Sequence, residues 1–205
     1  MTRPGFRKGS PGGSRQPGGA TPTEGFLSGS LFSQTQILHL MKAEFARARR
    51  HDFPLSCILM QVDRLPQLVD LHGAALRAAV RGALTAMVQE KTRGADLLGA
   101  MNDDRYLLLL PHTSLEQARI VAGRLGRHFL ELQITVDGKE LALDLALGLA
   151  ACEDRQTMFF DSMVVQAESA LEYAMQRGGD RIATFSEAHL LVDEPPPAEH
   201  PEKPA

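Results

Sequence analysis

The sequence of 205 residues contains no tryptophan, two tyrosines and two cysteines, and it lacks any long apolar run. Cys57 and Cys152 lie in short apolar stretches without the spacing of metal ligands or of a disulfide framework. We therefore expect buried, reduced thiols and no metal ion. No stretch reaches the roughly 20 apolar residues of a membrane span, and the N-terminus has no apolar signal-peptide core. These absences predict a cytoplasmic protein with no membrane partner.

An excess of one charge is also absent. The chain has 22 Lys and Arg against 25 Asp and Glu, which gives a net charge of −3, and its pI is about 6.2. This balance gives no reason to expect a nucleic acid as partner. Hydrophobic residues make up 43% of the chain and charged residues 23%, the usual mixture of a globular domain. The length predicts one domain with tails.

The two ends differ in composition from the middle of the chain. Residues 1–24 are rich in Gly, Pro, Ser and Arg, and residues 191–205 are rich in Pro and Glu. Neither segment shows apolar periodicity, so we expect both to be disordered tails. The globular domain is then expected over residues 25–190.

Apolar periodicity divides this domain into alternating helices and strands. Helical spacing predicts helices over 35–50, 68–88, 115–129 and 160–177, and short apolar runs predict strands over 55–62, 97–101, 106–110, 132–136, 141–150 and 181–185. The turn-forming residues at 102–105 and at 137–138 predict two β-hairpins. The pattern is typical of an α/β fold (an α+β sandwich) with a central, mostly antiparallel sheet flanked by helices.

The order of these elements and several local motifs resemble the GGDEF family of diguanylate cyclases. The resemblance runs from about Ser33 to Phe185 and requires few gaps. The segment CILMQVDRL at 57–65 is similar to the family's strand that ends in Asp-x-Asp-x-Phe, and LLLLP at 107–111 is similar to the strand after the signature hairpin. Residues 167–182 are similar to the family's last helix and strand. The resemblance implies the nucleotidyl cyclase fold.

The family joins two GTP molecules by metal-assisted phosphoryl transfer, which requires carboxylates and a close backbone approach to the phosphates. The first carboxylate position falls on Gln61 and the second on Asp63. The five signature positions fall on Asn102, Asp103, Asp104, Arg105 and Tyr106. Both glycines are therefore replaced, and the second acid has become a cation.

Further positions of the family pattern also differ. The two residues that read guanine in the family fall on Val69 and Ala78, and the lysine of the last helix falls on Met175. Val69 and Ala78 offer no side-chain hydrogen bond. From these differences we expect a domain that is not an enzyme, has no catalytic residues and holds neither metal nor cofactor.

A second site of the family is retained. Many members carry an inhibitory Arg-x-x-Asp motif before the signature, and Arg93 and Asp96 stand at its positions. Arg124 matches an arginine that completes this site, and Arg47 matches one that contacts the ligand from a second subunit. The resemblance implies cyclic di-GMP as the ligand. Arginine pairs bidentately with phosphate or with the guanine edge, and a carboxylate can accept hydrogen bonds from guanine.

Other interpretations of these residues stay open. Arg93 and Asp96 can form a simple surface ion pair, and Arg124 and Arg47 can be solvated helix residues. Three hypotheses result: a cyclic di-GMP receptor, a protein-interaction scaffold that binds no nucleotide, and a residual cyclase that uses Asp63, Asp104 and Arg181. Partners under these hypotheses are cyclic di-GMP, an unidentified protein and a second copy of the chain as a homodimer.

Overall fold

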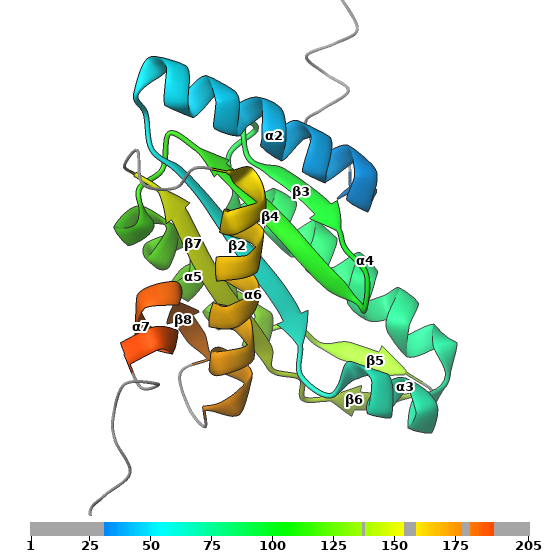
Figure 1. The fold of residues 1–205 in the computed structure, drawn as a ribbon. Helices are drawn as coiled ribbons and strands as arrows, with labels where there is room; N and C mark the ends of the chain where they lie inside the picture. The colour runs from blue at the N-terminus through cyan, green and yellow to red at the C-terminus, as the bar shows by residue number, and fades with distance from the viewer. Residues whose placement is uncertain (1–30, 137, 154–158, 178–180, 191–205) are drawn as a thin grey trace, which may run out of the picture.

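The computed structural model describes residues 31–136, 138–153, 159–177 and 181–190. The expected tails lie outside these residues, as does Asp137 of the second expected hairpin. Figure 1 shows a twisted sheet in the centre of the domain, with helices on both of its faces. This arrangement confirms the α/β fold with helices flanking a central sheet.

The sheet has six strands in the order β1-β3-β4-β2-β7-β8. They are β1 (Leu31–Phe32), β2 (Leu55–Val62), β3 (Leu97–Ala100), β4 (Arg105–Pro111), β7 (Leu145–Cys152) and β8 (Ile182–Thr184). β2 pairs antiparallel with both β4 and β7, and β3 pairs antiparallel with β4. The outer pairs β1–β3 and β7–β8 are parallel. The prediction of a mostly antiparallel sheet is confirmed.

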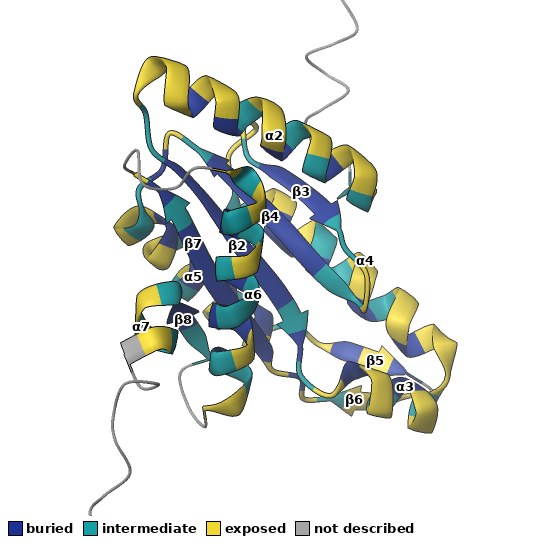
Figure 2. Cartoon of the chain, in the orientation of Figure 1, coloured by how far each residue is buried: buried dark blue, intermediate teal, exposed yellow. Residues whose placement is uncertain are grey.

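Helices cover the sheet in two layers. α2 (Gln34–His51) and α6 (Phe160–Gln176) pack on one face, α3 (Leu65–His72), α4 (Ala74–Lys91) and α5 (Leu115–Leu130) on the other, and α7 (Phe185–Leu190) follows β8. Side chains of β2 alternate between the layers: Ile58 and Met60 join the core under α4 and α5, whereas Cys57 and Leu59 join the core under α2 and α6. The buried strands and the exposed outer faces of the helices are clear in Figure 2.

Both cysteines are buried, as expected, and they form no disulfide with each other. Burial raises the pKa of the Cys57 thiol to about 12, so this thiol stays protonated at neutral pH. None of the helices in the described part of the chain is long and apolar enough to cross a membrane.

The prediction of a single helix over 68–88 is wrong, because the structure has two helices there. Gly73 separates α3 from α4 and has φ = 83°, a conformation that favours glycine. The expected strand over 141–150 is also divided. β6 (Lys139–Leu141) pairs antiparallel with β5 (Ile134–Val136) in a separate two-stranded sheet, and β7 begins at Leu145.

Strand β1 and helix α7 are absent from the sequence prediction. α7 begins with a capping box, in which the Thr184 amide donates to Glu187 Oε2 (2.8 Å) and the Glu187 amide donates to Thr184 Oγ1 (3.4 Å). The spacing Thr-x-x-Glu is visible in the sequence, so this helix start was predictable. β1 has only two residues, too few for any periodicity.

The hairpin expected at 102–105 is confirmed. Asp103 and Asp104 have φ values of 58° and 57°, and the Arg105 amide donates to the Asn102 carbonyl oxygen at 3.2 Å. Two consecutive residues of positive φ define a type I′ turn, whose twist matches that of the flanking strands. Asp tolerates this conformation better than most residues, which explains how the turn forms without glycine.

The start of α5 is held by residues far apart in the sequence. Ser114 caps the helix in a second capping box with Gln117. The Leu115 amide donates to the carboxylate of Glu153, which follows β7, and Arg119 forms an ion pair of 2.8 Å with Glu187 of α7. Three separate contacts therefore fix the N-terminal half of α5.

The close contact of α6 with β7 depends on Gly148. A Cβ atom at this position would lie 2.3 Å from both the Ala167 carbonyl oxygen and the Leu171 amide nitrogen. Because backbone atoms of a packed helix cannot move aside, we expect Gly148→Ala to lower the free energy of unfolding by about 3 kcal/mol, measured by urea denaturation. Gly82→Ala is the control, since a Cβ at Gly82 meets nothing within 4 Å. Equal stability of the two variants would contradict this account.

Candidate functional site

Polar residues gather at the end of the sheet where β2 stops and the 102–105 hairpin turns. Gln61 of β2 and Arg105 of β4 are register partners, so their side chains lie on the same face of the sheet. Arg105 Nε donates to Gln61 Oε1 at 3.1 Å, and its Nη1 lies 3.8 Å from Glu168 Oε1 of α6. The Arg105 guanidinium thus links two strands to a helix.

The hairpin is also tied to the opposite helical layer. Arg77 of α4 forms an ion pair of 3.0 Å with Asp104, whereas no interaction of Asp103 is seen in the described part of the chain. Tyr106, the next residue of the strand, points into the core under α4 and α5, and burial raises the pKa of its hydroxyl. Asp104 therefore holds the turn against α4.

Asp63 lies just beyond β2 and has two arginine partners. Arg181 Nη1, at the start of β8, lies 3.2 Å from Asp63 Oδ2, and Arg64 Nε lies 3.2 Å from the same oxygen. Arg181 Nη2 also approaches Asp144 Oδ2 at 3.7 Å. The side chains of Asp63 and Arg181 are 15% and 20% exposed, so this pair is largely shielded from water.

The two positions that read guanine in the family carry apolar side chains in this chain. Val69 is buried in the core and Ala78 is exposed on α4. Among the described residues, no three His, Cys, Asp or Glu side chains are grouped closely enough to hold a metal ion. The carboxylates of Asp63 and Asp104 are instead paired with arginines.

The structure brings Arg93, Asp96 and Arg124 together. Arg93 and Asp96 lie in the turn between α4 and β3, where the Arg93 amide donates to Asp96 Oδ2 at 2.8 Å and the Asp96 amide donates to the Arg93 carbonyl oxygen at 3.0 Å. Burial raises the pKa of the Asp96 carboxyl, whereas the Arg93 amide and the charges of Arg93 and Arg124 act in the opposite direction. Arg124 of α5 is therefore close enough to Asp96 to affect its charge.

Arg47 does not join these three residues. It lies on α2, in the other helical layer, and its Nη1 forms an ion pair of 2.9 Å with Glu44 Oε1, one turn earlier. Within one copy of the chain, the cluster of Arg93, Asp96 and Arg124 therefore does not include Arg47.

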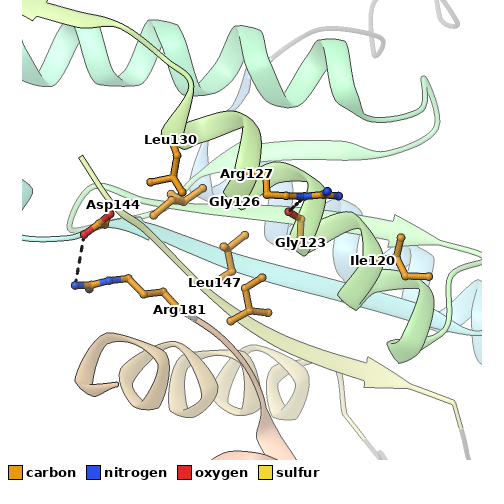
Figure 3. A pocket seen from close by; sticks show the side chains of 10 residues that line it. Ile120, Gly123, Gly126, Arg127, Leu130, Asp144, Leu147 and Arg181 are labelled. Carbon is orange, nitrogen blue, oxygen red and sulfur yellow. Dashed lines mark hydrogen bonds and ion pairs between the residues drawn. The ribbon is translucent and has the colours of Figure 1, made fainter. Parts of the chain in front are cut away.

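Sequence reasoning missed a groove between α5 and the edge of the sheet. It has a volume of about 480 Å³, and its lining residues are Ile120, Gly123, Gly126, Arg127, Leu130, Asp144, Leu145, Leu147, Arg181 and Ile182. Figure 3 shows α5 along one side of the groove and Arg181 and Asp144 on the other. The floor consists of residues from β7 and β8. Such a groove cannot be predicted from the sequence without the tertiary structure, because its walls come from three separate segments.

An α/β domain with this strand order, a two-residue hairpin and a flanking arginine–aspartate turn defines the class of the protein. The family model described as "Diguanylate cyclase, GGDEF domain" matches residues 29–181. The chain belongs to the GGDEF family.

Two relatives show the same family relationship. The chain is 26% identical over 137 residues to diguanylate cyclase A of Treponema denticola, covering 66% of this chain and 36% of that protein. It is 22% identical over 153 residues to diguanylate cyclase DosC of Escherichia coli K12, covering 74% of this chain and 33% of that protein. The chain thus spans about a third of the length of these curated relatives.

Solved structures have the same fold. The active GGEEF domain of a diguanylate cyclase from Vibrio cholerae superposes with a TM-score of 0.70 at 21% identity, covering 76% of this chain and 98% of that chain. The GGDEF domain of DgcB from Caulobacter crescentus, in complex with cyclic di-GMP, has a TM-score of 0.70 at 11% identity, covering 76% and 92%. SiaD from Pseudomonas aeruginosa, a diguanylate cyclase in complex with its activator SiaC, has a TM-score of 0.68 at 25% identity, covering 73% and 57%.

These relationships contradict the prediction that the chain is not an enzyme. That prediction was based on single substituted positions, such as Gln61 and Arg105. The relatives that match two thirds or more of this chain carry the name diguanylate cyclase. Two carboxylates of the family pattern, Asp63 and Asp104, are present at the same end of the sheet. The chain is accordingly described as a GGDEF domain related to diguanylate cyclases.

The contribution of the Asp63–Arg181 ion pair to stability can be tested directly by substitution. Arg181→Met leaves a shielded carboxylate with only an exposed partner, so we expect the free energy of unfolding to fall by about 2 kcal/mol. Arg64→Met is the matched control, because Arg64 contacts the same oxygen but is 76% exposed, and it should change stability little. Chemical denaturation of both variants measures the difference. Similar losses in the two variants would disprove the dominant role of Arg181.

Proposed function

We propose that this GGDEF domain binds cyclic di-GMP through Arg93, Asp96 and Arg124. The observation that carries the proposal is one half-buried carboxylate, that of Asp96, which is held by the Arg93 amide and lies near enough to the exposed Arg93 and Arg124 for both to affect its charge. In the described residues neither guanidinium is engaged in an ion pair of its own. Both are available to an anionic ligand.

The charges suit a cyclic dinucleotide. Each arginine can form a bidentate pair with a phosphate or with the O6 and N7 atoms of guanine. The backbone hydrogen bond from Arg93 occupies Asp96 Oδ2 and fixes the carboxylate in the turn. The carboxylate can then accept from the N1 and N2 hydrogens of guanine, a contact that adenine does not offer. This combination supports selection of a guanine dinucleotide.

The location of the cluster supports the proposal further. Arg93 and Asp96 lie in the turn between α4 and β3, Arg124 lies on α5, and none of the three takes part in the ion pairs that hold the hairpin. The DgcB domain, which has the same fold, was solved with cyclic di-GMP. A partner protein is the alternative ligand for this surface, and SiaD is an example of a relative with a protein activator.

Two arginines of α5 allow the proposed site to be tested, because one belongs to the site and the other does not. Arg124 is close enough to Asp96 to affect its charge, whereas Arg127, less than one turn further on, lines the groove beside α5. We expect Arg124→Ala to weaken cyclic di-GMP binding by about 2 kcal/mol, roughly thirtyfold in Kd, because a charged contact is lost. Arg127→Ala removes an equal charge from the same helix and should leave the Kd unchanged.

Calorimetric titration of cyclic di-GMP into each variant and into Arg93→Ala measures these effects. Binding that all three variants retain would place the ligand elsewhere. No binding to the unaltered chain would leave a nucleotide-independent interaction surface as the better explanation.

Binding should also depend on pH through Asp96. Burial raises the pKa of this carboxyl above that of an ordinary aspartate, so it takes up a proton earlier as the pH falls. The protonated form accepts guanine hydrogens poorly, and we therefore expect the affinity to decrease on acidification from neutral pH. Titrations at constant ionic strength measure this decrease. Asp96→Asn should bind weakly and lose most of the pH dependence; an equally steep dependence in this variant would assign the effect to another group.

A further inference from the structure

The outer face of α5 carries an apolar stripe that nothing in the described part of the chain covers. Ile120 and Leu130 are 72% and 66% exposed, and they rank among the most exposed large hydrophobic residues of the domain. Together with Gly123 and Arg127 they follow one another along the helix on the groove side (Figure 3). We call Ile120, Gly123, Arg127 and Leu130 the α5 stripe. Its spacing of three, four and three residues is that of a helix–helix contact seam.

The stripe is symmetric about Leu125. Ile120 and Leu130 lie five residues before and after it, and Gly123 and Arg127 lie two residues before and after it. Leu125 itself is fully buried. At 3.6 residues per turn, all four residues of the stripe project from the side of the helix opposite Leu125. A second α5, running antiparallel, would therefore meet this stripe with the same residues in reverse order.

Each pair in that arrangement is complementary. Ile120 meets the Leu130 of the other copy, so two exposed apolar side chains cover each other. The long side chain of Arg127 lies opposite Gly123, where a Cβ atom would meet nothing within 4 Å. The apolar side chains at the two ends and the sizes of the central side chains thus match along the stripe.

We propose that two copies of this chain associate through antiparallel packing of their α5 stripes. The groove beside α5, with a volume of about 480 Å³, offers room for the side chains of the second helix. The contact is isologous, since the same residues are used by both copies, and it closes as a dimer. Arg124 belongs neither to the stripe nor to the lining of the groove, so the contact does not require cyclic di-GMP and is independent of the binding proposed above.

Gly123 allows a test that spares the fold. Gly123→Leu places a large side chain where the second helix must approach, but its Cβ atom meets nothing within 4 Å in one copy, and leucine favours the helix. We expect the full chain to associate with rising concentration in sedimentation equilibrium without nucleotide. The dimer dissociation constant of Gly123→Leu should be at least about tenfold higher.

Gly82→Leu is the matched control, because Gly82 lies on α4 with equally open space around it, and this variant should associate as the unaltered chain does. A chain that stays monomeric at every concentration overturns the proposal. So does a Gly123→Leu variant that associates normally.

Cysteine cross-linking tests the antiparallel direction. In this arrangement position 120 of one copy lies beside position 130 of the other, whereas two copies of position 120 are about 15 Å apart along the axis, which no disulfide spans. Ile120→Cys mixed with Leu130→Cys should therefore form disulfide-linked dimers, and each variant alone should not. The native Cys57 and Cys152 are buried and do not compete. Efficient linkage of Ile120→Cys to itself would overturn the antiparallel arrangement.

Discussion

The pairing of β2 with two neighbours is the interaction on which the rest of the domain depends. Residues from Leu55 to Gln61 are in register with β4 on one side, and the whole strand is in register with β7 on the other. Its side chains alternate between two cores, so a slip of one residue would turn both apolar sets to the wrong face. The same register places Gln61 beside Arg105 and ends the strand at Val62, just before Asp63. The polar end of the sheet is thus set by the packing of its centre.

The arginines of this domain divide into two groups by their surroundings. Arg77, Arg105 and Arg181 each join two or more elements at the hairpin end of the sheet, through carboxylates on different segments. Arg93 and Arg124 instead flank the single carboxylate of Asp96 and remain exposed to solvent. An ion pair that joins two elements mainly holds segments in place, whereas an exposed cation beside a fixed carboxylate can exchange water for a ligand.

Much of the fold could be predicted from the sequence because its signals are local. The apolar stripe of α2, the run of β2 and the turn at 102–105 each determine their structure within a few residues. The break at Gly73 was missed because apolar helical spacing continues on both sides of it, and only the backbone conformation ends the helix. Motif resemblance singled out Arg93, Asp96 and Arg124 as binding residues, and their role in binding stays a prediction. The partners of Asp63 and Arg105, and the groove beside α5, depend on contacts between distant segments, which no local pattern contains.

The unequal anchoring of α5 has a mechanical consequence. Its first half is fastened by Ser114, by the carboxylate of Glu153 and by the Arg119–Glu187 pair, whereas its second half is held mainly by buried side chains such as Leu125 and Phe129. Polar contacts therefore hold only the first half of the helix, and Arg124, Arg127 and Leu130 all lie in the less restrained second half. A nucleotide or another helix that binds to this half could shift it relative to the sheet, because apolar contacts tolerate small displacements more readily than hydrogen bonds do.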